Sequence, residues 1–328
     1  MKTVKQHSRS APSRKTIYAA LAGNCLVAIT KFVAAAWTGS ASMLSEGIHS
    51  LVDMGNELLL LYGDHRAKRL PDLARPLGYG RELYFWSFIV ALLIFALGSG
   101  ATLIQGVVHI FDPHPIEDAY VNYIVLASAL MFEGASWWVS IREFRKEKGS
   151  AGYFEAFRRS KDPTNFMILF EDSAALIGIL IALAGTWAAK TFQLPALDGV
   201  ASALIGLVLG STALLLAQET KSLLMGEPAD PEVVNSLTDI ATEDSAVLAI
   251  NGIVTVHIGP RQVMVALSVE FADNLKTADL ETKVAEIEDR VRALHPEVIA
   301  LFVKPQTPGR FMESRQERFG IKAPLPSN

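Results

Sequence analysis

The stretch SEGIHSLVDMGNE, residues 45–57, decides how the rest of the chain is interpreted. It lies inside an apolar segment, residues 41–62, that is long enough to cross a bilayer as a helix. Its polar members recur at three- and four-residue steps: Glu46, His49, Asp53, Asn56 and Glu57. Residues with this spacing share one face of a helix, so the sequence predicts a polar stripe along an otherwise apolar helix.

Two interpretations of the stripe remain open. His49 and Asp53 are four residues apart, so both can reach one metal ion, and zinc, iron(II) and manganese(II) accept imidazole and carboxylate ligands. The structural alternative is a set of hydrogen bonds that lock a helix bundle. A lone His or Glu favours that alternative. Several such groups on one membrane-embedded face favour an ion or proton site, because ionisable groups are costly at that depth.

The composition indicates a membrane protein with a soluble tail. Of the 328 residues, 50% are hydrophobic and 20% are charged, and the charge is concentrated at the start, in two loops and in the last hundred residues. The one cysteine, Cys25, excludes an intrachain disulfide and a thiolate zinc cluster. A net charge of −4 gives no reason to expect a nucleic-acid partner.

We mark six apolar spans, each near the ~20 residues that a helix needs to cross the hydrocarbon core. They run over residues 16–38, 41–62, 83–110, 119–141, 166–189 and 197–217. Lysine and arginine gather in residues 2–15, 66–81 and 142–161, whereas the alternate connections are poor in both. The positive-inside rule therefore predicts that both termini are cytoplasmic. The basic start does not resemble a cleaved signal peptide, and we expect a bacterial cytoplasmic membrane.

Other polar residues in the spans are further candidates. Lys31 is expected either to pair with a carboxylate of residues 41–62 or to extend towards an interface. Glu133 is a second-rank functional candidate, with a structural pairing as its alternative. Glu171 and Asp172 are adjacent and point about 100° apart on a helix, so they cannot face one point equally. Gly206 and Gly210 have the spacing that permits close helix approach.

The composition changes after the sixth span. A helix is predicted for residues 231–243, with Asp230 as its N-cap and Pro231 at its first position. Strands, a helix and a final strand are then predicted at residues 253–258, 262–271, 277–294 and 298–303. This order, αββαβ, predicts a small ferredoxin-like α/β domain. The expected organisation is therefore a basic N-terminus (1–15), a six-helix transmembrane domain (16–225), a cytoplasmic α/β domain (226–306) and a tail (307–328).

With these segments in place, the chain resembles the cation diffusion facilitator family of metal transporters over nearly its full length. The segments that carry the resemblance are residues 45–53, 75–81, 170–178 and 223–228. The Glu-Asp-x-Ala-Ala form of the third segment, together with Leu-Gly-Tyr-Gly at residues 77–80, is similar to the branch that contains the mitochondrial zinc transporters of animals.

The resemblance implies a function and a site. Members of the family export divalent transition metals from the cytoplasm, usually in exchange for protons and usually as homodimers that meet through the cytoplasmic domain and the membrane helices. The implied ligands are His49, Asp53 and Asp172. Zinc is favoured as the transported ion, and iron(II), manganese(II) and cobalt(II) are compatible with the same ligands. No prosthetic cofactor is expected.

This sequence departs from the family pattern in two places. Ile168 stands where the family commonly has a His or Asp four residues before Asp172, so a tetrahedral ion lacks one ligand. Water could complete the site, and so could Glu46 or Glu171. The face of the helix favours Glu46 as a ligand, with Glu171 supporting a ligand or carrying a proton. Where some members have a second metal site built from histidines, this chain has Arg75 and Tyr79, and no metal is expected there.

Two histidines of the α/β domain, His257 and His295, are interpreted as surface or turn residues. Two other classes of function stay open at this stage, a metal-dependent membrane enzyme and a sensing or structural membrane protein. The enzyme would need three or four ligands, an activated water and a separate acid or base, for which Glu57 or Glu133 is available. Metal flux in sealed vesicles distinguishes all three.

Overall fold

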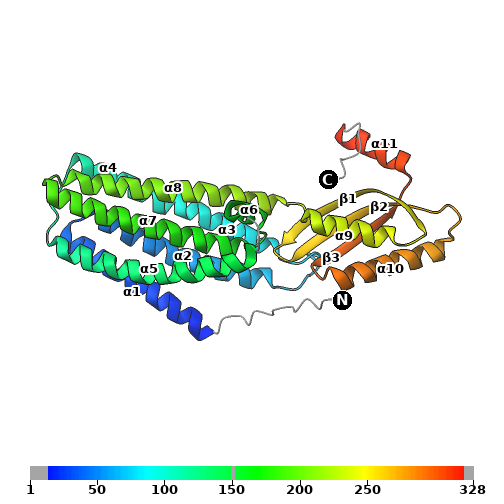
Figure 1. The fold of residues 1–328 in the computed structure, drawn as a ribbon, viewed down its shortest axis with the longest axis horizontal. Coiled ribbons are helices and arrows are strands. Elements are labelled where there is room, and N and C mark those ends of the chain that lie inside the picture. Colours follow the sequence, from blue (N-terminus) through cyan, green and yellow to red (C-terminus); the bar gives the residue numbers. More distant parts are fainter. Residues whose placement is uncertain (1–13, 149–151, 321–328) are drawn as a thin grey trace. The chain divides into compact units, whose positions relative to one another are not determined.

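The computed structural model describes residues 14–148 and 152–320 (Figure 1). The first helices are α1 (Arg14–Thr38), α2 (Ala41–Ala67), α3 (Arg81–Leu93), the π-helix η1 (Ile94–Gly100), α4 (Ala101–Phe111), α5 (Ala119–Lys148), α6 (Tyr153–Arg159), α7 (Pro163–Phe192) and α8 (Ala196–Met225). They are followed by α9 (Pro231–Thr242), β1 (Val247–Gly259), β2 (Gln262–Phe271), α10 (Thr277–Leu294), β3 (Val298–Pro305) and α11 (Pro308–Phe319).

The chain divides into two compact units. The first, which we call the bundle unit, comprises residues up to 61 together with 89–146 and 167–217. The second, the C-terminal unit, comprises residues 62–88, 147–166 and everything from residue 218 onwards. The C-terminal unit therefore contains the ends of several long helices as well as the sheet. Of the sequence-based division, the predicted N-terminus 1–15 falls almost entirely outside the described residues.

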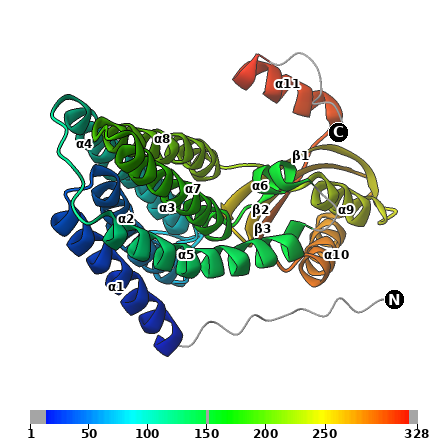
Figure 2. The ribbon, with the colours of Figure 1, turned by 60° about the vertical axis from the view of Figure 1, so that its left-hand side comes forward.

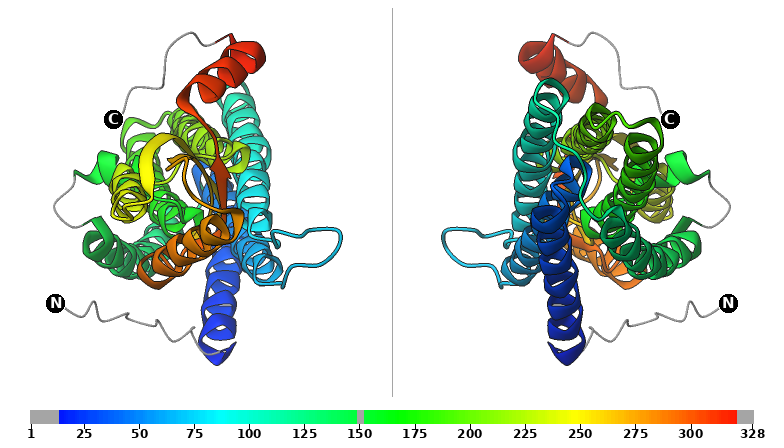
Figure 3. Two further views of the ribbon diagram at one scale, coloured as in Figure 1. Left: turned by 90° about the vertical axis from the view of Figure 1, so that its right-hand side faces the viewer. Right: turned by 90° about the vertical axis from the view of Figure 1, so that its left-hand side faces the viewer.

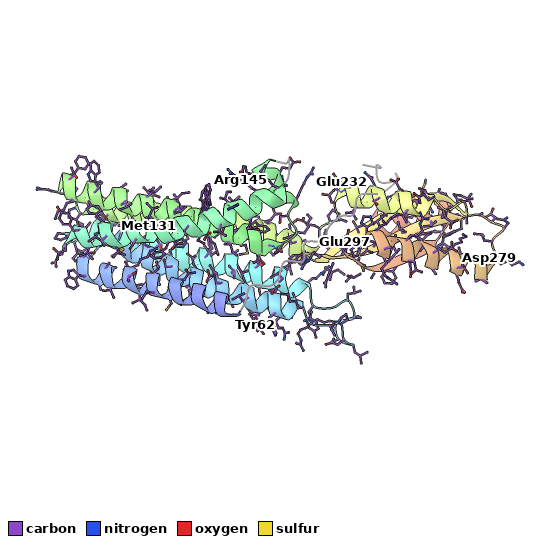
Figure 4. The ribbon with its side chains drawn as sticks, turned by 60° about the horizontal axis from the view of Figure 1, so that its bottom comes forward. Tyr62, Met131, Arg145, Glu232, Asp279 and Glu297 are labelled. Atoms are coloured by element: carbon purple, nitrogen blue, oxygen red, sulfur yellow. The ribbon has the colours of Figure 1, made fainter. Side chains whose placement is uncertain are left out.

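Within the described residues, four helical stretches are long and apolar enough to cross a membrane: Arg81–Phe111, Ala119–Arg145, Phe166–Phe192 and Ala196–Met225. The first of them is the continuous run of α3, η1 and α4. The other two predicted spans are helical, as α1 and α2, but they are not among the four. Within α1 the apolar stretch Asn24–Thr38 is shorter, and α2 carries the polar stripe that lowers its apolar character. Lipid-facing side chains such as Met131 of α5 are strongly exposed (Figure 4).

Small residues let α8 approach the run η1–α4 closely. A Cβ atom added to Gly106 would lie 2.5 Å from the backbone nitrogen of Ala203, and one added to Gly206 would lie 2.7 Å from Cγ of Leu103. In η1, the Ser99 hydroxyl donates a hydrogen bond of 2.8 Å to the Gly206 carbonyl. The close approach predicted from Gly206 is therefore confirmed, and these backbones meet at distances that only glycine permits.

The C-terminal sheet has the strand order β1-β2-β3. β1 and β2 are antiparallel, whereas β2 and β3 are parallel and are joined through α10. Helices α9 and α10 cover one face of the sheet (Figure 2). Alternate residues of β2 point into the resulting core, because side chains of a strand alternate between faces. The buried core includes Leu237, Ile240, Val263, Val265, Leu267, Val269, Ile287 and Val291.

The element order α9-β1-β2-α10-β3 matches the predicted order, and Asp230 caps α9 by accepting a hydrogen bond from the Glu232 amide. Two details differ from the prediction. β1 begins at Val247, because sheet pairing overrides the poor strand propensities of Asn251 and Gly252. The segment expected to be a tail contains α11, which is capped by Thr307.

Candidate metal site in the helix bundle

The N-terminus of α2 is held by a buried carboxylate of α8. Asp198 accepts hydrogen bonds from the hydroxyls of Ser40 and Ser42 and from the backbone amides of Ala41 and Ser42. An acceptor at the first amides of a helix stabilises it by about 1 kcal/mol, and a negative charge there opposes the positive end of the helix dipole. Asp198 is not among the candidate residues predicted from the sequence. The one indication in the sequence was the pair Ser40 and Ser42 at the start of the helix that carries the polar stripe.

His49 and Asp53 face each other one turn apart on α2. His49 is 2% exposed, and its Nδ1 lies 3.4 Å from Oδ1 of Asp53. This separation is within the distance of an ion pair. However, neither ring nitrogen of His49 makes a hydrogen bond, and Oδ1 of Asp53 accepts none. Buried polar atoms are nearly always paired with a partner. His49 and Asp53 therefore present three ligand-type atoms that the fold itself does not pair.

A buried lysine occupies the next position along the stripe. Lys31 of α1 donates to Oε2 of Glu46 at 3.1 Å and to the Ser50 hydroxyl at 2.8 Å, and it lies 3.8 Å from Glu133 of α5. The predicted pairing of Lys31 with a carboxylate of α2 is thus confirmed. Glu133 also lies within ion-pair distance of Lys31, which is the structural pairing that was predicted as the alternative to a functional role. One oxygen of Glu46 is engaged by the ammonium, and the other is buried without a hydrogen bond.

The adjacent acids of α7 face different helices. Glu171 is buried and accepts a hydrogen bond of 2.9 Å from the Asn56 amide of α2. Asp172 accepts hydrogen bonds from Ser136 at 3.1 Å and Ser140 at 2.8 Å, both on α5. The 100° between neighbouring residues on a helix therefore directs Glu171 towards the stripe and Asp172 towards α5. This arrangement differs from the sequence-based preference for Asp172 on the face towards the stripe.

These groups are neighbours, but their side chains do not converge. Asp53 is close enough to Glu171, Glu133 and Asp172 for electrostatic interaction. Among the residues that the structure describes, however, no three His, Cys, Asp or Glu side chains are arranged to hold a metal ion. The carboxyl groups outnumber the nearby Lys31, so the cluster favours a cation. Binding through three protein ligands would require one of the α7 acids to rotate towards His49 and Asp53.

The three side chains that donate hydrogen bonds to Glu171 and Asp172 are difficult to identify from the sequence. Ser136 and Ser140 are spaced four apart within an apolar span, which places both on one face of α5. Asn56 was noted as a member of the stripe, without a partner. Which acid each of them contacts depends on how the helices pack.

The positions of the second metal site found in some family members hold a different arrangement. The Tyr79 hydroxyl donates a hydrogen bond of 2.6 Å to Asp72, and the guanidinium group of Arg75 lies 5.3 Å from the Tyr79 ring. The Tyr79 hydrogen bond and the nearby backbone amide of Arg75 lower the pKa of Asp72. Asp72 is thereby kept in its charged form, with its oxygens already engaged by this loop.

The two histidines of the predicted α/β domain, His257 and His295, are both engaged. His257 is buried within β1, so its interpretation as a surface or turn residue is wrong, and burial lowers its pKa. His257 lies within the strand predicted at residues 253–258, and it is buried because it shares a face of β1 with the buried Thr255. His295 follows the last turn of α10, with its ring nitrogens 2.8 Å from the Ser236 hydroxyl and 3.0 Å from a Glu297 oxygen.

Comparison with known proteins identifies relatives over most of the chain. A family model described as the cation efflux transmembrane domain matches residues 17–225. The Homo sapiens protein named proton-coupled zinc antiporter SLC30A9, mitochondrial, is 32% identical over 283 residues, which is 84% of this chain and 50% of that protein. Metal tolerance protein C4 of Arabidopsis thaliana is 32% identical over 262 residues, 79% of this chain and 57% of that protein. The chain thus spans about half the length of these two relatives.

A more distant similarity extends to bacteria. The manganese efflux system protein MneP of Bacillus subtilis is 23% identical over 222 residues, which is 68% of this chain and 72% of that protein. The names of these relatives include both a zinc antiporter and a manganese efflux protein.

Proposed function

The chain belongs to the cation diffusion facilitator family, near the branch that contains SLC30A9, and from this premise we propose that it exports divalent transition-metal cations, zinc foremost, in exchange for protons. The observation that carries the proposal is the pair of a buried His49 and a partly buried Asp53 on α2, with three buried ligand atoms that make no hydrogen bond. Imidazole and carboxylate are ligands that zinc accepts, and a divalent cation would satisfy both.

The ligands proposed for the transported ion are His49, Asp53 and an acid of α7. Asp172 is available if it exchanges its two serine hydrogen bonds for the metal, and such bonds to a charged group contribute about 1.5–3 kcal/mol each. For the remaining position, the contacts favour Glu171 over Glu46. Glu171 already contacts α2 and lies near Asp53, whereas Lys31 engages Glu46.

Proton exchange follows from the chemistry of these ligands. A metal binds the deprotonated forms of imidazole and carboxylate, so binding displaces protons and release of the metal takes them up again. In this scheme Lys31 acts as a fixed positive charge that holds Glu46 and Glu133 away from the ion. Glu171 or Asp172, whichever does not bind the metal, carries a proton.

The proposed topology has six spans, with α1 and α2 crossing the membrane beside the four apolar stretches. Both termini and the C-terminal sheet lie on the cytoplasmic side, because the basic loops alternate with the poor ones. We place the protein in a bacterial cytoplasmic membrane and expect it to act as a homodimer.

The test is zinc flux by the purified protein in sealed vesicles, with and without a pH gradient. We expect zinc uptake into the vesicles to be faster when the vesicle interior is more acidic than the outside. Protons should then leave the vesicles as zinc enters them. A protein that binds zinc but moves none would favour the sensing alternative. Zinc-dependent hydrolysis without flux would favour the enzyme.

A further inference from the structure

The loop that joins α2 to α3, residues 68–80, exposes leucines to an unusual degree. It extends away from the ends of the two helices that it connects (Figure 3). Leu70 and Leu73 are 84% and 105% exposed, and Leu77 is exposed as well. Single exposed leucines are ordinary on protein surfaces, but several in one short polar loop mark an interaction surface.

Three arginines from the end of α2 and from this loop surround the ring of Tyr79. The guanidinium carbons of Arg66, Arg69 and Arg75 lie 5.7, 5.0 and 5.3 Å from the centre of the Tyr79 ring. Arg66 is paired with Glu82, at 3.1 Å. In the described part of the chain, no carboxylate lies within ion-pair distance of Arg69 or Arg75.

The loop is held in shape by its own hydrogen bonds. Asp72 accepts from the Tyr79 hydroxyl at 2.6 Å and from the amides of Ala74 and Arg75 at 3.0 and 2.8 Å. Gly78, at a φ of +84°, completes the turn in a backbone conformation that favours glycine. A guanidinium over an aromatic ring keeps its N–H edge free, and that edge binds phosphate oxygens in a bidentate manner.

The depth of the loop follows from the proposed topology, on which this inference rests. α2 has 27 residues, which corresponds to about 40 Å at 1.5 Å per residue, whereas the hydrocarbon core is about 30 Å thick. If α2 spans the membrane, its last turns extend into the headgroup layer. A surface there with both leucines and unpaired arginines matches the two chemical layers of an anionic lipid leaflet.

The geometry points to a lipid-docking function for this loop: Leu70, Leu73 and Leu77 insert at the acyl boundary while Arg69 and Arg75 bind the phosphate of an anionic phospholipid. The occupant is the bilayer in which the protein is embedded. Lys68, the first residue of the loop, takes no part in the site, because it is already paired with Asp64 of α2.

The depth of the loop can be measured with one label. Cys25 is the chain's one cysteine, so Cys25→Ala leaves a background in which Leu73→Cys can carry a nitroxide. The full-length protein is placed in nanodiscs of phosphatidylcholine alone or mixed with phosphatidylglycerol. Collision of the label with oxygen and with a water-soluble nickel chelate then reports its depth.

In the anionic nanodiscs we expect a several-fold loss of nickel collision and a gain of oxygen collision, relative to phosphatidylcholine alone. The double variant Arg69→Gln, Arg75→Gln should return the label to the aqueous values. Lys68→Gln removes the same type of charge from the same loop and should leave the depth unchanged. This pair of variants separates the proposed site from a general effect of basic charge.

Four results would overturn the proposal. A label that stays aqueous in both lipids shows that the loop does not insert. Equal burial with and without the arginines shows that they bind no lipid phosphate. Burial that appears only in nanodiscs holding two copies assigns the surface to a second chain. Burial induced in phosphatidylcholine by added inorganic phosphate assigns it to a free anion. None of these results depends on whether the protein transports metal.

Discussion

At the scale of single residues, the polar groups of the bundle unit differ in whether they already have a partner. Lys31, Glu46, Glu171 and Asp172 are engaged in ion pairs or hydrogen bonds. His49 and Asp53 are within 3.4 Å of each other and lack hydrogen bonds at three atoms. The engaged groups hold the helices together, so their replacement affects folding as well as function. Replacement of His49 or Asp53 affects function more selectively.

His49→Ala and Asp53→Ala are each expected to lower metal affinity by more than ~100-fold, because even groups that only support a ligand contribute about 10–100-fold. Zinc flux in vesicles should fall to the background rate, while the variants still elute as folded protein in detergent. Leu51→Ala, on the exposed face of the same helix, is the matched control. Wild-type flux from either ligand variant would remove that residue from the site.

The fourth ligand is addressed by Glu171→Gln and Glu46→Gln. From the contacts we expect Glu171→Gln to weaken zinc binding more, since Glu171 lies near Asp53 and Glu46 is engaged by Lys31. Removing one partner of a buried ion pair costs about 3–5 kcal/mol, so Glu46→Gln should instead lower the melting temperature. Calorimetric zinc titration and thermal unfolding distinguish the two effects. A larger affinity loss for Glu46→Gln would restore the preference drawn from the sequence.

At the scale of elements, α2 is positioned by contacts with three neighbouring helices, spread from its first turn to its middle. Asp198 of α8 holds its first turn, Lys31 of α1 contacts Glu46, and Glu171 of α7 contacts Asn56. The approach of α4 to α8 supports this arrangement through glycines. In the C-terminal sheet, helices pack against one face. His257 of β1 is buried in this sheet.

Gly106→Ala should destabilise the bundle by about 1–3 kcal/mol, the usual cost of inserting an atom into a packed interface. The new Cβ would meet backbone rather than a flexible side chain, so α4 and α8 would have to separate. Thermal unfolding in detergent measures the effect. Gly134→Ala is the control, because no atom lies within 4 Å of its added Cβ. Equal melting temperatures for both variants would show that the close approach contributes nothing.

The C-terminal unit is expected to lose stability as the pH falls below about 6.5. Burial lowers the pKa of His257 from its ordinary value of 6.5, so the unfolded chain binds this proton at a higher pH than the folded chain does. Its contribution is therefore fully present above pH 6.5 and declines as the pH falls towards the folded pKa. Hydrogen exchange of β1 amides at pH 7.5 and 5.5, corrected for intrinsic rates, reports the change. The same pH effect in His257→Gln would assign it to another group.

At the scale of the whole molecule, two units combine a bundle that carries the candidate site with a C-terminal sheet. The family model covers residues 17–225 and ends before the sheet. One face of the sheet is covered by α9 and α10, whereas Val254 and Phe302 remain exposed. An exposed apolar sheet surface of this kind supports the proposed homodimer.

We expect native mass measurement in detergent to give twice the mass of one chain. The double variant Val254→Glu, Phe302→Glu should shift the population towards the monomer, because the new carboxylates would be buried in the interface without partners. Glu232→Gln, on the outer side of α9, is a control that should leave the dimer intact. A wild-type monomer that still transports zinc would contradict the proposed assembly.

The sequence by itself determined that the six apolar segments are helical, in which order the helices and strands from residue 231 to 305 follow, and which residues are candidates for binding a cation. Hydrophobic periodicity and loop charge are local properties, and a four-residue spacing places His49 beside Asp53 in any α-helix. Tertiary structure alone decided which partner each remaining group has: Lys31 engages Glu46, Asn56 turns Glu171 towards α2, and serines of α5 hold Asp172. Helix rotation and packing set these contacts, and both depend on side chains far apart in the chain, such as Gly106 against Ala203.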